Sequence, residues 1–405
     1  MGATALSTLD GLLKRHYSTG FVANQQNFDP DFISVLPQAT EKMGGEGGAF
    51  YFPVNLQRAQ NGGAQNENET FRDNTSAVRK QATIAAKINV WAIEITGFAI
   101  NMSESQVDAF SSGLESEFED KLAAFKKDLN RQSFGTGSGK LALVNGALVA
   151  STALVVDTPG VQYFFPGMKI DIFNSAGTVK QASAVVVSSI AESTNTITLA
   201  SAVSCDDNGI IVKEKIKDNA ASDGKEVMGL YGISDDGTEF TTFENLSRST
   251  YDIWKGSITD ASGAVITNDL LQRAIDKGER RSGRKIDTIY SHRNQRRQYL
   301  NLVTPMKRFN DNSKMDSGMP GGLEWNGMMW NVSHDCQRDT VYAFPKKDVQ
   351  KFESHAIKLD DTEGKTIHRI SRTDTFEAYY KHYGNIGTKY PASIVRLGNL
   401  ATVTD

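Results

Sequence analysis

One long run of regularly spaced apolar residues constrains this chain more than any other feature. Between Ser103 and Phe134, apolar side chains recur every three or four positions and so share one stripe of a helix; they are Val107, Phe110, Leu114, Phe118, Leu122, Phe125 and Leu129. Ser103 and Gln106 predict a capping box at its start, and Gly135 predicts its end. At about 1.5 Å per residue the helix would be roughly 45 Å long, more than an average globular domain needs. The sequence therefore predicts a rod across a flat subunit.

The segments before this helix are predicted to be extended. Residues 1–45 are polar and weakly periodic, with small apolar clusters at Phe21–Val22 and Phe32–Ile33, which predicts an arm that needs a neighbour's surface. Apolar runs at 49–54 and 78–100 predict strands. Residues 57–77 between them contain no Val, Ile, Leu or Met, and cannot bury themselves in their own domain. We expect residues 46–100 to form an extended β-hairpin loop.

The rest of the chain predicts an α+β fold. Residues 153–216 alternate short apolar segments, among them Tyr163–Phe165, with turns, and so predict a small all-β insertion. Thr267 predicts the cap of one helix, and Ser291 predicts the cap of a second helix that reaches Leu302. Further strands are expected at Ile286–Tyr290, Met328–Val332, Thr340–Phe344, Ile367–Ile370 and Phe376–Tyr383.

Composition narrows the classes of function. With 44 basic and 48 acidic side chains, the net charge is −4, so no global positive field would coat DNA. Cys205 and Cys336 are far apart and lack zinc-ligand spacing, which excludes a disulfide framework and suits a reducing cytosol. Residues 1–20 lack the apolar core of a signal peptide, and the most apolar run, 141–156, is too short to span a membrane. We expect no membrane partner.

Two motifs suggest chemistry but lack the required register. Gly135–Lys140 invites a phosphate-loop interpretation, but it ends a helix instead of opening one, and Leu141 stands where Ser or Thr should bind magnesium. His334 and Cys336 flank Asp335, but neighbouring residues on a strand point to opposite faces, so no nucleophile–base contact is expected. The six histidines show no metal-ligand spacing either. The sequence predicts no catalytic residue, no cofactor-binding residue and no metal ligand.

Charged clusters remain as candidate surfaces. The acidic turns 205–209 and 234–237 lack the spacing of a calcium loop and are predicted to be solvated. The basic groups fit either phosphate binding or contact with acids of a neighbouring subunit, and the acidic total favours the second; they are Arg280, Arg281, Arg284, Lys285, Arg293, Arg296, Arg297, Lys307 and Arg308.

The order of these segments resembles the major capsid proteins of tailed bacteriophages, whose Hong Kong 97-type coat fold is shared with herpesvirus capsids. Residues 48–95 look like the extended loop of that family, and 103–134 look like its spine helix. Residues 288–302 and 344–349 are similar to its axial domain, and 383–387 with 391–394 look like its closing peripheral strands. The implied domains are an N-terminal arm 1–45, extended loop 46–100, spine helix and peripheral domain 101–152, β insertion 153–216, return to the peripheral domain 217–260, axial domain 261–365 and closing peripheral strands 366–405.

The resemblance implies a structural protein and not an enzyme. Hexamers and pentamers of the chain would form an icosahedral shell around double-stranded DNA, assembled in the host cytoplasm and kept in the virion. Implied partners are the chain itself, a separate scaffolding protein, a portal, a decoration protein and weak, non-specific contact with packaged DNA. Some family members cross-link their shells through a lysine in the extended loop, but 57–77 contains no lysine, so no such cross-link is expected.

Two other classes of function remain open from the residues alone. A decoration or tail-tube protein is also a particle component, but such proteins seldom need both a long helix and a mixed α/β domain. A carbohydrate-active enzyme with a β-type binding module would require two carboxylates at a cleft. No pair of acidic residues in the sequence stands out as such a catalytic pair.

Overall fold

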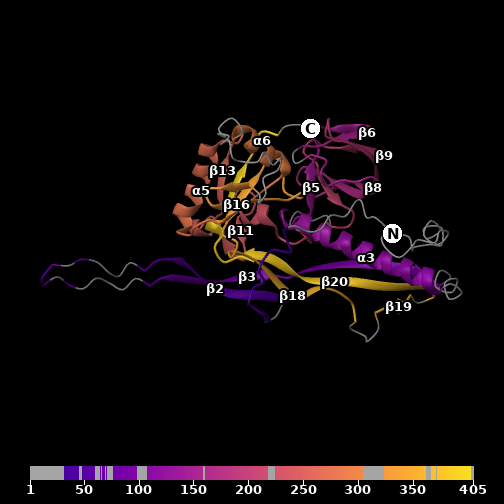
Figure 1. Cartoon of the computed structure of the whole chain (residues 1–405), viewed down its shortest axis with the longest axis horizontal. Coiled ribbons are helices and arrows are strands. Elements are labelled where there is room, and N and C mark those ends of the chain that lie inside the picture. The colour runs from indigo at the N-terminus through magenta and orange to yellow at the C-terminus, as the bar shows by residue number, and fades with distance from the viewer. Residues whose placement is uncertain are drawn as a thin grey trace, which may run out of the picture. The chain divides into compact units, whose positions relative to one another are not determined.

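The computed structural model describes residues 32–44, 48–59, 64, 66–68, 70, 76–97, 107–157, 160–217, 224–303, 323–361, 366–370 and 372–402. The chain forms two compact units. One comprises Met1–Val35, Ala86–Asn130 and Glu353–Gly384, and the other comprises Leu36–Ala85, Arg131–Phe352 and Asn385–Asp405. Figure 1 labels the main elements of both units. The described residues form both helices and strands, which confirms the mixed α and β class.

The first unit packs the long helix against a sheet. Helix α3 (Val107–Gln132) lies along strands β4 (Lys87–Thr96), β18 (Val349–Leu359), β19 (His368–Arg369) and β20 (Thr375–Thr388), where β20 is the central strand (Figure 1). Trp91 stacks on Phe125 with ring centroids 5.8 Å apart, and Phe118 meets Tyr380 edge-on. The described half of the apolar stripe, Phe118, Leu122, Phe125 and Leu129, faces into the unit as expected, and 26 residues give a rod about 39 Å long. The expected capping box at Ser103 and Gln106 lies outside the described residues.

The extended loop is a hairpin at its base. Strand β2 (Ala49–Gln57) pairs antiparallel with β3 (Val78–Ala85), and the short β1 (Met43–Gly44) pairs with β2. Most of residues 60–75, between β2 and β3, lies outside the described residues. The apolar run expected at 78–100 is interrupted at Ala86, because β3 belongs to the hairpin and β4 to the sheet under α3.

The β insertion forms a six-stranded antiparallel sheet. Its order is β5 (Lys140–Leu143), β10 (Ile210–Lys213), β7 (Lys169–Phe173), β8 (Lys180–Ala191), β9 (Thr196–Cys205) and β6 (Leu148–Val155). A bridge between Val144 and Val156 joins the two edge strands at one end, so the sheet curls into a barrel-like unit around an apolar core. The sheet also includes β5 and the first part of β6, which precede Ala153. Tyr163–Phe165 was wrongly expected to be a strand; it is a turn, and its aromatic side chains produced the apolar signal.

The second half contains a mixed sheet beside two helices. Its order is β13 (Ser257–Asp260), β21 (Val395–Gly398), β17 (Val341–Phe344), β14 (Thr288–Ser291), β16 (Met328–Val332) and β15 (Leu323–Trp325). Helices α5 (Asn268–Ser282) and α6 (Arg293–Val303) accompany it (Figure 1). Because β21 pairs with β13 and β17, the segment expected to close the peripheral domain is divided between this sheet and the one containing β20. The domain boundaries themselves stay predictions.

The helix caps show one expectation confirmed and one wrong. The Thr267 side chain accepts a hydrogen bond from Leu270 N, as a capping residue of α5 should. Ser291 does not cap α6, because its hydroxyl accepts from Trp330 Nε1 at 2.7 Å and donates to His292 O. His292 takes that place: its Nδ1 accepts from Asn294 N at 3.1 Å.

The described part of the N-terminal arm also corrects an expectation. Phe32 and Ile33 were assigned to an arm that needs a neighbour, but both are buried, and their amides donate to Asn130 Oδ1 at 3.1 Å. These residues belong to the subunit's own core. Residues 1–31, including Phe21–Val22, lie outside the described residues.

Smaller elements connect the sheets. They are α4 (Leu230–Ile233), the hairpin of β11 (Thr242–Phe243) and β12 (Leu246–Ser247), and the short 3₁₀ turns Asp252–Trp254 and Pro391–Ser393. Among the helices that the structure describes, none has the length and apolar character needed to cross a membrane.

Candidate functional site

Aromatic packing fixes the base of the extended hairpin. Phe50 and Phe52 on β2 are buried against Phe352 at the start of β18, with ring centroids 5.7 Å and 6.0 Å away. On β3, Ala82 and Ile84 are buried as well. The hairpin therefore has an apolar base, whereas Arg79 and Lys80, at the start of β3 and away from this base, are exposed.

Backbone and side-chain hydrogen bonds join this base to two other elements. Thr83 N donates to Glu244 O at 2.9 Å, and Thr388 N donates to the Glu244 side-chain oxygen Oε1 at 3.1 Å. Asn385 Nδ2 donates to Ala85 O at 2.8 Å. We call this set the hairpin root: Phe50, Phe52, Thr83, Ala85, Glu244, Phe352, Asn385 and Thr388.

Glu244 occupies an unusual backbone position in the hairpin root. It and Asn245 form the tight turn between β11 and β12, with φ of 50° and 63° respectively. This pair of left-handed residues matches a type I′ turn, which suits a two-residue hairpin. The turn directs the Glu244 carboxyl inward, where Oε2 is buried and accepts no hydrogen bond from the described residues. Burial raises the pKa of this carboxyl well above its usual 4.5, although the hydrogen bond from Thr388 and the charge of Arg248 oppose the shift.

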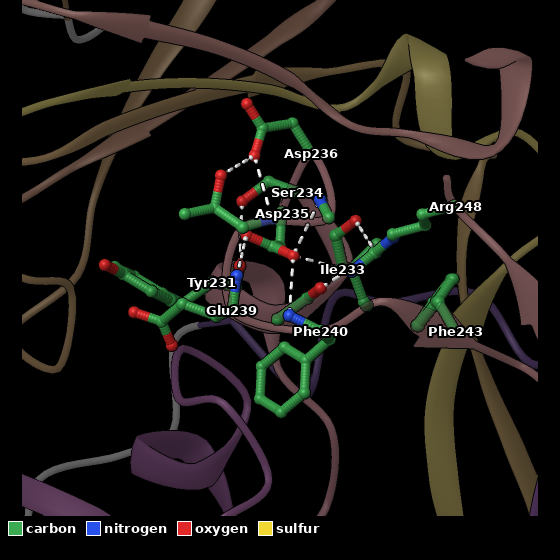
Figure 2. Close-up of polar contacts among 12 residues, drawn as sticks. Tyr231, Ile233, Ser234, Asp235, Asp236, Glu239, Phe240, Phe243 and Arg248 are labelled. Carbon is green, nitrogen blue, oxygen red and sulfur yellow. Dashed lines mark hydrogen bonds and ion pairs between the residues drawn. The ribbon is translucent and has the colours of Figure 1, made fainter. Parts of the chain in front are cut away.

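A buried ion pair holds the loop that leads to this turn (Figure 2). Arg248 and Asp235 have completely buried side chains, and Arg248 Nη1 donates to Asp235 Oδ2 at 3.1 Å. Arg248 Nη2 also donates to the carbonyl oxygens of Gly232 and Ile233, at 3.0 Å and 2.9 Å. The guanidinium lies 4.4 Å from the ring centre of Phe243, a cation–π contact.

Asp235 is further satisfied by its own loop. Its carboxylate accepts hydrogen bonds from the backbone amides of Gly237, Glu239 and Phe240 (Figure 2). Burial lowers the pKa of Arg248 to about 10, with Asp235 opposing the shift, so the guanidinium is still charged at neutral pH. The expectation that turn 234–237 is solvated is therefore wrong for Asp235. The arrangement resists movement of the loop and offers no acid–base pair to a substrate.

The two sequence motifs with apparent chemistry have structural roles. Residues 135–140 connect the end of α3 to the start of β5, and Gly137 and Gly139 adopt positive φ, which confirms a helix stop followed by a linker. Cys336 is completely buried and its thiol points to Thr340 O, while the ring of His334 lies 6.3 Å from that of His292. Among the described residues, no group of His, Cys, Asp and Glu side chains could hold a metal ion.

Comparison with solved structures identifies one fold. No protein-family model and no curated protein matches the sequence. Among solved structures, the capsid asymmetric unit of cyanophage A-1(L) is similar with a TM-score of 0.60 at 10% identity, over 95% of this chain and 96% of that one. The capsid of a native GTA particle has a TM-score of 0.50 at 9% identity, over 98% and 99% of the two chains. This chain has the Hong Kong 97-type capsid fold.

The capsid fold is not confined to phages among the similar structures. The holo-SrpI encapsulin complex from Synechococcus elongatus PCC 7942 has a TM-score of 0.50 at 7% identity, over 100% of this chain and 98% of that one. The resemblance that the order of segments predicted is thus confirmed for the fold, at identities too low for the residues of a site to be transferred.

Within this capsid fold, the predicted basic groups separate into two kinds. Arg281 donates to Gly256 O at 2.7 Å, and Arg284 binds both carboxylate oxygens of Asp348 at 2.7 Å, so these two stabilise the subunit itself. Arg280, Lys285, Arg293, Arg296 and Arg297 are exposed. Lys307 and Arg308 lie outside the described residues.

No sequence pattern indicates the hairpin root or the buried ion pair. Asp235, Asp236 and Gly237 look like any polar turn, and Arg248 stands in an unremarkable polar segment. Thr83, Glu244 and Thr388 are far apart along the chain, so only the fold brings them together.

Proposed function

We propose that this protein is the major subunit of an icosahedral phage shell that encloses double-stranded DNA. The observation that carries the proposal is its similarity to the cyanophage capsid asymmetric unit over nearly the whole of both chains. Hexamers and pentamers of the subunit would build the shell, with a separate scaffolding protein, a portal and a decoration protein as further partners. The subunit would assemble in the host cytoplasm, remain in the virion and catalyse no reaction.

The hairpin root gives this proposal a physical basis. A hairpin whose base is packed and hydrogen-bonded, and whose far part is polar, keeps surface available for another subunit. Symmetry repeats such a contact at every subunit, and each repeat adds buried interface area. Contacts that are weak individually can therefore produce a stable shell.

Sedimentation velocity of the purified protein tests the proposal. We expect a fast, narrow boundary of closed particles, either for the chain alone or with its scaffolding protein. A monomer under both conditions, combined with turnover of a polysaccharide, would replace the proposal with the enzyme alternative. A denaturing gel of the particles should show single subunits, because residues 57–77 contain no lysine for cross-linking; a ladder of linked subunits would contradict that part.

The similarity to the encapsulin complex supports a second candidate, a shell of the encapsulin type. Particles purified from the native source distinguish the two candidates. Nuclease-protected DNA inside them is expected for the phage shell, whereas particles that contain protein and no DNA would favour the second candidate.

A further inference from the structure

The first turns of α6 carry exposed positive charge without a local explanation. Arg293 and Arg296 are the first and fourth residues of the helix, and both are exposed. Within the described part of the chain, neither forms an ion pair, and α6 itself contains no acidic residue. Cations near a helix N-terminus face the positive end of the helix dipole, so this placement weakens the helix.

A comparison with α5 shows that this placement differs from the rest of the subunit. Arg280 and Arg281 lie in the last turn of α5, where the dipole favours cations, and Arg281 and Arg284 are bound internally. Residues that destabilise their own helix, and that no contact within the subunit compensates, are expected to have a function.

The sequence continues the same charge beyond the helix. Residues 293–308 contain five basic residues and no acidic one: Arg293, Arg296, Arg297, Lys307 and Arg308. Because this stretch of sequence contains no acidic residue, its charge suits a partner that carries only the opposite sign, as the phosphodiester backbone does. Arginine adds a planar fork that can bind phosphate oxygens in pairs.

Acids of a second subunit are the alternative partner for this surface. Several exposed acids of the described chain already lie beside a base of the same chain; the pairs are Glu192–Arg338, Asp252–Lys255, Asp269–Arg273, Asp361–Lys358 and Asp374–Arg369. The sequence alone favoured subunit contact for the basic groups, because the chain is acidic overall. The structure shifts the preference toward a phosphate partner, because Arg293 and Arg296 are exposed at the N-terminal end of a helix that contains no acidic residue.

We infer that the exposed arginine face of α6 is a sequence-independent binding surface for the phosphate backbone of duplex DNA. The inference rests on the proposed function, since a shell around DNA has an inner surface that contacts phosphate. Binding is expected to be weak and to fall with salt, because each neutralised phosphate releases a counterion.

Fluorescence anisotropy with a labelled 30-base-pair duplex and the unassembled subunit tests the inference. The variant Arg293→Gln/Arg296→Gln should bind more weakly, and the slope of log affinity against log salt should become shallower by about 1.8, which is about 0.9 for each lost contact. Arg280→Gln/Lys285→Gln is the matched control, because it removes two exposed cations, one from the last turn of α5 and one from the segment that follows it, and should leave the slope unchanged.

Three results would overturn the inference: a wild-type subunit whose duplex binding does not depend on salt, equal losses in the two variants, or unchanged binding by the α6 variant. Shell assembly, measured in parallel, separates this inference from the proposed function. If the α6 variant retains duplex binding but forms no particles, the arginine face is a subunit contact. If wild-type subunits form no particles, either alone or with the scaffolding protein, but bind duplex through α6, the proposed function fails and the inference about α6 stands.

Discussion

Arg248 is a single residue whose buried contacts hold the loop that leads to the β11–β12 turn. Its charge is completely buried and is compensated by Asp235, two carbonyl oxygens and the face of Phe243. A charge in this position is tolerated only while all its partners are present, because removal of one leaves another buried and unpaired.

We therefore expect Arg248→Met to lower the free energy of unfolding by about 3–5 kcal/mol, because Asp235 loses its counterion in the interior. Urea unfolding of the unassembled subunit at neutral pH measures this loss. Arg273→Met is the control: its partner Asp269 is exposed, and the change should be about 0.5 kcal/mol or less. Similar small losses in both variants would show that the buried pair is not a major source of stability.

Glu244 should make the unfolding free energy of the subunit depend on pH. Because burial raises the pKa of its carboxyl in the folded state, the unfolded chain ionises first as pH rises. The stability linked to this group is complete below the unfolded pKa of 4.5 and is lost as pH rises toward the higher folded pKa. Glu244→Gln keeps an oxygen for Thr388 N but cannot ionise.

Urea unfolding at pH 4.5 and pH 8 tests this dependence. The difference in unfolding free energy between Glu244→Gln and the wild type should shift in favour of the variant at the higher pH. An equal difference at both pH values would mean that the Glu244 carboxyl ionises normally in the folded protein.

At the scale of elements, the hairpin depends on one ring from another strand. Phe352 contacts both Phe50 and Phe52, and its exposed fraction is 1%. Phe352→Ala should cost about 3–5 kcal/mol, through lost burial and the cavity left behind. Hydrogen exchange should show faster exchange in β2 and β3 than in the barrel-like insertion. The exposed Val149→Ala, at 83% exposure, serves as the control, and slow exchange in the hairpin of the Phe352 variant would contradict its assigned role.

The same scale shows what sequence patterns can and cannot predict. The stripe on α3 and the strands of the hairpin were predicted because each repeats its own period along the chain. Strand β18 was missed, because Val349 and Phe352 are three residues apart and Lys351, Glu353 and Lys358 interrupt the alternation. Contacts of the hairpin root could not be predicted, since they join residues more than a hundred positions apart.

At the scale of the whole molecule, two truncations separate folding from assembly. Deletion of residues 1–31 should leave the unfolding free energy close to that of the full chain while impairing shells. Deletion of residues 1–40 also removes Phe32, Ile33 and Leu36, which are buried, and should destabilise the subunit by several kcal/mol. Circular dichroism melts and particle yield measure the two effects. Normal shells from the shorter deletion would show that the arm has no role in assembly.

Electron microscopy of the protein expressed alone, and again with its scaffolding protein, tests the central claim most directly. The account predicts closed particles of uniform size whose surface resolves into rings of six and five subunits. Extended tubes, or single subunits at high concentration under both conditions, would contradict the claim that this capsid fold builds an icosahedral shell.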